Sequence, residues 1–139
     1  MAPKLNVLFD LNVILDVLQK REPFYSASAR ALASAEVGLV EGWVAAHSLT
    51  TLFYLLARHE SPERARVALT DLLNIVSVAA VDQTVVERAL VLPYQDFEDA
   101  VQMMAAVRLG ADYLVTRNVR DYQAGPLPVL QPVELLALL

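Results

Sequence analysis

The residues of this sequence whose types and spacing suit chemistry are acids and amides, and they recur in three groups. The groups are Asp10 with Asn12, then Asp96 with Glu98 and Asp99, and finally Asn118 with Asp121. Carboxylates brought together repel one another and raise one another's pKa unless a cation compensates their charge. Oxygen ligands suit a hard ion, Mg²⁺ or Mn²⁺, which lowers the pKa of a bound water and offsets charge on a leaving oxygen. Together the groups predict metal-assisted phosphodiester hydrolysis.

Each group also has an explanation that requires no catalysis. Acids at a helix start are favoured by capping and by the helix dipole, which accounts equally well for Asp96 and Glu98. Asp10 could simply cap the helix that follows it, and Asp121 could be solvated surface. Asp16 lies six positions after Asp10, and the sequence favours neither a supporting nor an exposed position for it. Both kinds of explanation stay open at this point.

The composition limits the class of protein. The 139 residues suit one domain, residues 1–139, which can bury enough apolar surface to fold without disulfides. The absence of cysteine excludes a disulfide framework, thiolate zinc sites and a cysteine nucleophile, and two histidines argue against a multi-histidine metal site. The net charge of −5 argues against a protein that coats nucleic acid. Charges interrupt every apolar run, so we expect no membrane span and a cytoplasmic protein.

Apolar periodicity and turn residues divide the chain into alternating strands and helices. We expect strands over 5–9, 42–46, 75–79 and 111–115, with at most a brief fifth at 128–130. Between them we expect helices over 13–18, 25–37, 48–58, 62–74, 83–92 and 97–109, and a terminal helix from 132. This alternation implies right-handed βαβ crossovers. The fold class is therefore α/β, with three layers in which helices flank a parallel sheet of four to five strands.

The same architecture predicts where the three groups meet. In open parallel sheets, ligands bind beyond the carboxyl ends of the strands. Asp10 follows the first expected strand, and the stretch 116–118 follows the fourth, so both belong to that edge. With the helix start at Asp96 brought to the same edge, all three groups would face one opening at the carboxyl edge of the sheet, called here the predicted mouth.

Three blocks of the sequence together resemble bacterial PIN domains: Phe9 to Asp16, Asp96 to Ala100 and Thr116 to Tyr122. The blocks occur in the order and at the spacing of that family, and the resemblance covers nearly the whole chain. It implies a Mg²⁺- or Mn²⁺-dependent endoribonuclease that acts on RNA. It also implies that the protein is often the toxin of a toxin–antitoxin pair, with an antitoxin protein as partner, and often a homodimer.

The resemblance also implies roles for individual residues. Asp10 and Asp99 would be the principal metal ligands and catalytic acids, with Asp121 as a third acid and Asn118 as a further ligand. The supporting residues would be Asn12, Thr51, Asp96, Glu98 and Thr116.

Two positions depart from the family pattern. Leu11 stands where Thr or Ser usually follows the first aspartate, and Thr51 stands where an acid on the third helix is expected. A hydroxyl supplies no negative charge, so a PIN fold that binds RNA or an antitoxin without cutting is an alternative function. A haloacid-dehalogenase-like phosphatase shares the opening block, but it needs an acid at the position of Asn12 and a downstream lysine. No lysine follows Arg21.

Cationic side chains near the predicted mouth could contact RNA phosphates, because such contacts position a substrate without reading its sequence. Arg117 and Arg120 flank the third group of acids and are the preferred candidates. Lys20, Arg21 and Arg58 are further candidates, although scattered surface charge is the commoner explanation for such cations. We therefore predict RNA contacts at Arg117 and Arg120.

Overall fold

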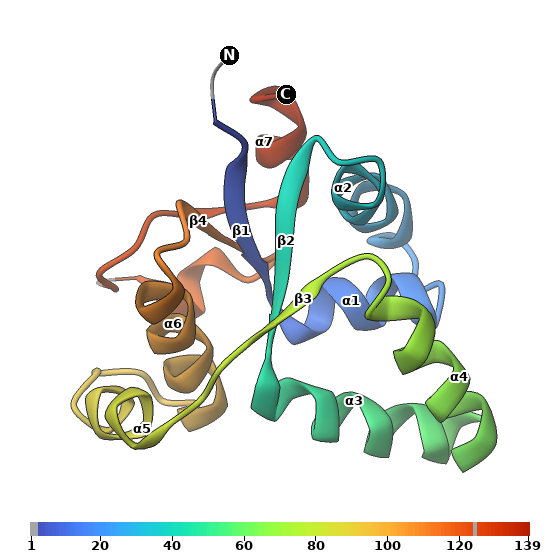
Figure 1. The fold of residues 1–139 in the computed structure, drawn as a ribbon, viewed down its shortest axis with the longest axis horizontal. Helices are drawn as coiled ribbons and strands as arrows, with labels where there is room; N and C mark the ends of the chain where they lie inside the picture. Colours follow the sequence, from blue (N-terminus) through green and yellow to red (C-terminus); the bar gives the residue numbers. More distant parts are fainter. Residues whose placement is uncertain (1–2, 124) are drawn as a thin grey trace.

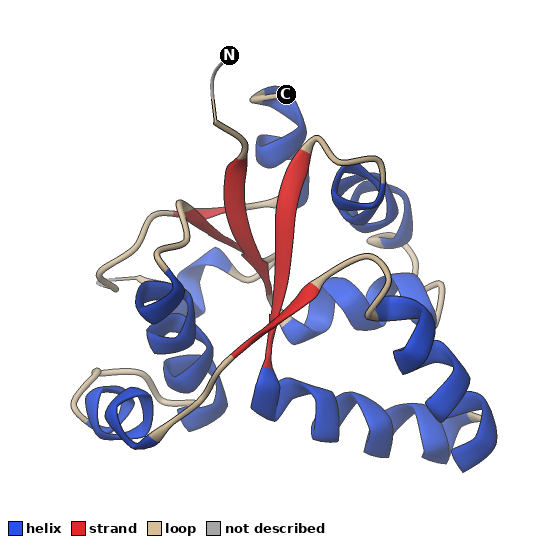
Figure 2. Cartoon of the chain, viewed as in Figure 1, coloured by secondary structure: helices blue, strands red, loops and turns tan. Residues whose placement is uncertain are grey.

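The computed structural model describes residues 3–123 and 125–139 and shows a parallel β-sheet with helices on both faces (Figure 1, Figure 2). Within these residues the strands are β1 (Leu5–Phe9), β2 (Val40–Ala45), β3 (Ser77–Ala79), β4 (Tyr113–Val115) and β5 (Val129–Leu130). The helices are α1 (Leu11–Leu18), α2 (Tyr25–Glu36), α3 (Ala46–His59), α4 (Pro62–Leu72), α5 (Gln83–Leu90), α6 (Phe97–Leu109) and α7 (Pro132–Ala137), with a 3₁₀ turn η1 (Val119–Tyr122). The predicted α/β class and flanked parallel sheet are confirmed. Among the residues described, no helix has the length and apolar character that a membrane span requires.

Two strands are shorter than the apolar runs that predict them. The runs begin at Ile75 and Ala111, whereas β3 and β4 begin two residues later. The N–H groups of Ile75 and Ala111 donate instead to the ends of the preceding helices, at the carbonyl oxygens of Leu72 (2.9 Å) and Ala106 (3.0 Å). An N–H group that closes a helix cannot also join a sheet ladder, so these apolar residues pack without pairing.

The central strand β1 is buried on both of its faces. Successive side chains of a strand point to opposite faces of the sheet. Val7 and Phe9 belong to a core shared with α1, α2, α3, α4 and α7, whereas Leu8 belongs to a second core shared with α5 and α6. This double burial explains why residues 7–9 of β1 are all apolar rather than alternating with polar residues.

The strand order creates a crevice at the carboxyl edge of the sheet. The order is β3-β2-β1-β4-β5, and every neighbouring pair is parallel. The winding direction reverses between β1 and β4, and at such a point the connections leave in opposite directions and open a crevice. Asp10 directly follows β1 and Thr116 directly follows β4, while the Asp10 N–H donates to the Val115 carbonyl oxygen (2.8 Å). Both polar residues are therefore fixed at the crevice by backbone pairing.

Candidate active site

Asp10 is buried at the crevice, and neutral donors hold both of its carboxylate oxygens. The residue is 2% exposed. Its Oδ2 accepts a hydrogen bond from the Thr116 hydroxyl (2.8 Å), and its Oδ1 accepts one from the Gln102 amide (3.0 Å) and lies 3.4 Å from the Tyr122 hydroxyl. Burial raises the pKa of Asp10, although these hydrogen bonds and one from the Asn12 backbone N–H lower it. The carboxylate is thus fixed in orientation without any compensation of its charge.

The start of α6 brings a second carboxylate to the crevice. Asp96 is the N-cap, because its Oδ1 accepts hydrogen bonds from the backbone N–H groups of Glu98 (2.8 Å) and Asp99 (3.4 Å). Asp99 itself accepts a hydrogen bond from the Tyr122 hydroxyl (3.0 Å). Burial, followed by the charges of Asp96 and Asp10, raises the pKa of Asp99 to about 7. Asp96 therefore caps the helix as the structural explanation predicts, while Asp99 carries a charge that its surroundings disfavour.

Gln102 completes the site, although it is not among the site residues predicted from the sequence. It is 1% exposed and lies three residues after Asp99, on the same face of α6. Its Oε1 accepts a hydrogen bond from the Leu11 N–H (2.9 Å) and so satisfies the first backbone donor of α1. A signal for it does exist in the sequence. Gln102 is the only polar residue between 100 and 107, and a buried amide requires partners.

Tyr122 is the other site residue that sequence reasoning missed. It ends η1, is 2% exposed, and packs edge-on against Tyr94 with ring centroids 5.8 Å apart. Its hydroxyl lies between the two carboxylates, 3.4 Å from Asp10 Oδ1 and 3.0 Å from Asp99 Oδ1. Burial and both neighbouring charges raise its pKa, so the hydroxyl stays protonated and donates. No local pattern marks this role, because an aromatic residue after a turn is commonly part of an ordinary core.

A hollow of about 510 Å³ opens beside these residues and is called here the Asp99 hollow. Its lining residues are Pro93, Tyr94, Gln95, Asp96, Asp99, Arg120, Asp121 and Gln123. Asp96, Asp99 and Asp121 thus face the same space, and Tyr122 lies between Asp10 and Asp99. Within residues 3–123 and 125–139, no cationic side chain forms an ion pair with Asp10, Asp96, Asp99 or Asp121. Negative charge is concentrated here without an ion pair among the residues described, although Arg120 lines the same hollow.

This donor set fits a hydrated divalent cation better than one enclosed entirely by protein ligands. In the described part of the chain, no three Asp, Glu or His side chains stand close enough together to bind one ion. Mg²⁺, however, keeps several waters and is commonly held by only one or two carboxylates. Asp99 and Asp121 both line a hollow with room for an ion and its waters, and their donors are oxygens, as a hard cation requires.

Thr51, which stands where the family resemblance leads us to expect an acid, is hydrogen-bonded to one. Its hydroxyl donates to Glu98 Oε2 (3.2 Å), and His47 Nε2, one turn earlier on α3, lies 3.1 Å from the Glu98 carbonyl oxygen. These contacts join α3 to the start of α6. The α3 position has no charge of its own, but a carboxylate from the neighbouring helix lies against it.

Two predicted site residues make other contacts. The Asn12 side chain accepts a hydrogen bond from Arg21 (3.3 Å), so its amide oxygen faces Arg21. Arg117 Nε donates to Asp16 Oδ2 (2.9 Å). Asp16 is fully buried, and a buried carboxylate requires paired charge, which accounts for this use of Arg117.

The remaining members of the third group lie near the predicted mouth. The Asn118 backbone N–H donates to the Thr116 hydroxyl (3.0 Å) and so supports the residue that holds Asp10. Arg120 is exposed and lines the Asp99 hollow. The role of Asn118 as a metal ligand and the RNA contacts of Arg117 and Arg120 stay predictions.

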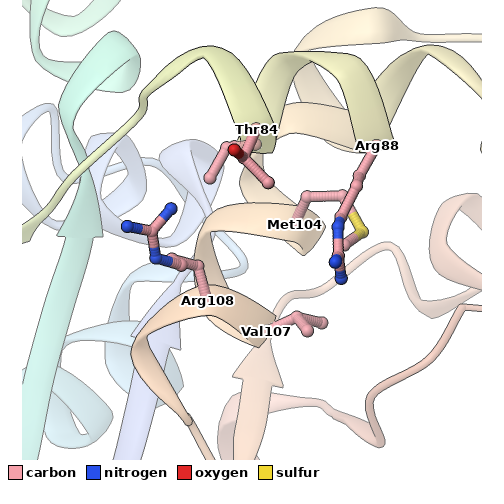
Figure 3. A pocket seen from close by; sticks show the side chains of 6 residues that line it. Thr84, Arg88, Met104, Val107 and Arg108 are labelled. Carbon is pink, nitrogen blue, oxygen red and sulfur yellow. The ribbon is translucent and has the colours of Figure 1, made fainter.

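A second hollow, of about 340 Å³, lies between α5 and α6 (Figure 3). Figure 3 shows Arg88 from α5 and Arg108 from α6 at this hollow. Its lining residues are Thr84, Val85, Arg88, Met104, Val107 and Arg108. None of them is acidic, so this hollow does not suit the predicted cation.

Comparison with known proteins identifies relatives of this chain. The family model described as "PIN domain" matches residues 6–120. Ribonuclease VapC1 of Aquifex aeolicus (strain VF5) is 23% identical over 133 residues, which cover 92% of this chain and 91% of that protein.

Solved structures share the architecture at lower identity. VapBC2 from Rickettsia felis, bound to a DNA fragment from its promoter, has a TM-score of 0.70 at 14% identity and covers 91% of this chain and 98% of that chain. VapC20 from Mycobacterium tuberculosis, described as a sarcin-ricin loop cleaving toxin, has a TM-score of 0.64 at 19% identity, with coverage of 78% and 86%. These likenesses confirm the predicted PIN-like architecture.

Proposed function

The chain belongs to the PIN-domain family, and on that premise we propose that it is a divalent-metal-dependent endoribonuclease. The observation that carries the proposal is that Asp10 and Asp99 both lie within hydrogen-bond distance of one hydroxyl, that of Tyr122, at the carboxyl edge of the sheet. Two carboxylates held together without a cationic partner are electrostatically suited to a cation. The similarity to Ribonuclease VapC1 supports RNA as the substrate.

Asp10 and Asp99 would hold the cation, with Asn118 and Asp121 as further oxygen donors. When bound, Mg²⁺ or Mn²⁺ supplies a nucleophilic water at neutral pH and offsets charge on the leaving oxygen. Thr116 keeps Asp10 in a single orientation through its hydrogen bond to Oδ2. Asp99 and Asp121 line the Asp99 hollow and would orient water there.

Arg120 would bring the phosphate backbone to this acidic site. A chain with a net charge of −5 repels RNA on average, so a cation at the site itself is needed to draw a phosphate in. Arg120 is the arginine that lines the Asp99 hollow. Its guanidinium suits a phosphate because it can donate two parallel hydrogen bonds.

The biological role that we propose is that of a toxin controlled by an antitoxin protein. The Rickettsia felis structure is a VapBC assembly, and a structure from Klebsiella pneumoniae of 22% identity and TM-score 0.69 is described as a toxin–antitoxin complex, with coverage of 91% and 97%. We extend the antitoxin partner, and association of two copies of the chain, to this protein by analogy.

A PIN fold that binds RNA or an antitoxin without cutting is the competing function, and Thr51 is the residue that favours it. The hydrogen bond from Thr51 to Glu98 weighs against it, because a carboxylate lies at that position despite the substitution. The phosphatase alternative lacks its lysine, since no lysine follows Arg21.

The test incubates the purified protein with structured and single-stranded RNA in Mn²⁺ or Mg²⁺. Asp10→Asn and Asp99→Asn should each reduce cleavage by roughly a hundredfold or more, because a bound metal contributes several kcal/mol of charge stabilisation. Asp71→Asn, which alters an exposed acid of α4, is the matched control and should cleave like the wild type. Cleavage that persists in both site variants, or no cleavage with either metal, would contradict the proposal.

A further inference from the structure

A buried amide and a buried hydroxyl connect the two carboxylates of the site. We propose that Gln102 and Tyr122, called here the Gln102–Tyr122 pair, position Asp10 and Asp99 for the cation. This role rests on the proposed function and adds two positioning residues to it. Both side chains are almost completely buried, at 1% and 2% exposure, so their contacts are with protein groups.

The orientation of the Gln102 amide follows from its surroundings. Its Oε1 accepts hydrogen bonds from the Leu11 N–H (2.9 Å) and the Ser48 hydroxyl (3.4 Å). Its Nε2 donates to Asp10 Oδ1 (3.0 Å) and to the Tyr122 hydroxyl (2.9 Å). Rotating the amide by half a turn would place an N–H group against the Leu11 N–H and an oxygen against a carboxylate. Both contacts would be repulsive, so only the first orientation is compatible with the surroundings.

The direction of the Tyr122 proton follows in turn. Because the hydroxyl oxygen accepts a hydrogen bond from Gln102, its own single proton must go to a carboxylate. Asp99 Oδ1, at 3.0 Å, is nearer than Asp10 Oδ1, at 3.4 Å. Hydrogen bonds therefore run from the amide to Asp10, from the amide to the hydroxyl, and from the hydroxyl to Asp99.

This arrangement holds like charges together without neutralising them. A lysine or arginine at either position would pair with the carboxylates and compete with a cation, whereas an amide and a phenol donate hydrogen bonds and carry no charge. Tyr122 engages Oδ1 of Asp99, which also lines the Asp99 hollow, so the hydroxyl determines which edge of that carboxylate faces the hollow. Groups that orient metal ligands in this way strongly influence metal affinity.

The experiment measures Mn²⁺ binding to the full chain by calorimetry, without RNA, and RNA cleavage separately as kcat and KM. The variants are Tyr122→Phe, Gln102→Met and the double variant. Tyr122→Phe removes one oxygen and keeps the ring that packs against Tyr94, so it retains the core. Tyr113→Phe, which removes a tyrosine hydroxyl on β4, is the matched control.

We expect each single variant to weaken Mn²⁺ affinity about tenfold or more and to lower kcat with little change in KM. The double variant should lose no more than the more severe single variant, because both residues act through one chain of hydrogen bonds. Wild-type affinity in Tyr122→Phe, or a loss confined to thermal stability, would overturn the positioning role. If the wild type cleaves RNA and binds Mn²⁺ while the variants match it, only this inference falls. If the wild type does neither, the proposed function falls with it.

Discussion

Two buried aspartates six positions apart are surrounded in opposite ways. Asp16, on α1, is fully buried and accepts hydrogen bonds from Arg21 Nε (3.0 Å) and Arg117 Nε (2.9 Å). Asp10 is 2% exposed and accepts hydrogen bonds only from neutral groups among the described residues. Both carboxylates have lost their water, but only one has gained cations.

The difference separates a structural carboxylate from one available to a ligand. A buried charge is tolerated when it is paired, and Asp16 uses its two arginines to tie the end of α1 to the segment after β4. Arg117 extends this connection to α2, since its guanidinium carbon lies 3.9 Å from the centre of the Phe24 ring. Asp10 has its orientation fixed by hydrogen bonds and its charge left free, which suits a residue that awaits a cation.

The largest contrast should come from neutralising each aspartate in turn. Asp16→Asn leaves two arginines beside an uncharged amide, and we expect the free energy of unfolding to fall by about 2 to 4 kcal/mol, since both arginines are partly exposed. Asp10→Asn should change it by less than about 1 kcal/mol, because an amide can still accept from Gln102 while donating to Thr116. Urea denaturation in EDTA measures both values.

Activity should follow the opposite order. Asp10→Asn loses RNA cleavage although it remains folded, while Asp16→Asn retains cleavage at temperatures where it is folded. Equal losses of stability in the two variants would show that pairing with cations does not distinguish these carboxylates.

A smaller effect concerns how stability depends on pH. Burial and the charges of Asp96 and Asp10 raise the pKa of Asp99 from its ordinary value of 3.8 to about 7. Between those values the folded, metal-free chain binds more protons at Asp99 than the unfolded chain does. Stability supplied by the protonated form is therefore fully present below about pH 4 and is lost as the pH rises through about 7.

Asp99→Asn should remove this contribution and give a shallower fall in the free energy of unfolding between pH 4 and pH 7. Urea denaturation in EDTA at several pH values compares the two proteins. An equal slope in both would mean that Asp99 titrates in the folded chain much as it does in the unfolded one.

The sequence predicts the fold well because its elements are specified locally. The run from Leu5 to Phe9 is apolar except at Asn6, and its consecutive apolar residues 7–9 fit a strand buried on both faces. Asp96 marks the start of α6 through its own capping contacts. The predicted strands begin two residues too early at Ile75 and Ala111. There the backbone N–H group donates to a carbonyl oxygen at the end of the preceding helix and not to a neighbouring strand. The apolar character of these two residues does not show which carbonyl oxygen their N–H groups bind.

The site is predicted only as far as residue type reveals it. Acids at strand ends and helix starts stand out by their chemistry, so Asp10 and Asp99 are found. Gln102 acts on Asp10 across 92 positions of sequence, and Tyr122 acts across 112. The pairing of Asp16 with Arg117 likewise spans 101 positions and requires the strand order to be known. The roles of these residues depend on contacts between distant parts of the chain, which cannot be read from a single sequence.

The smallest expected effects compare two arginines three positions apart, Arg117 and Arg120. Arg120→Ala should weaken RNA binding about three- to tenfold and leave stability within about 0.5 kcal/mol, because the side chain is exposed at the Asp99 hollow. The salt dependence of binding should also decrease by about one unit of slope. Arg117→Ala should instead destabilise the fold and weaken RNA binding less than Arg120→Ala does, since its guanidinium is already held by Asp16. Fluorescence anisotropy with RNA, in an Asp10→Asn background that prevents cleavage, measures both. An equal loss of RNA affinity in the two variants would mean that the ion pair with Asp16 leaves Arg117 free to bind phosphate, and that a cation held by a buried acid can serve both purposes.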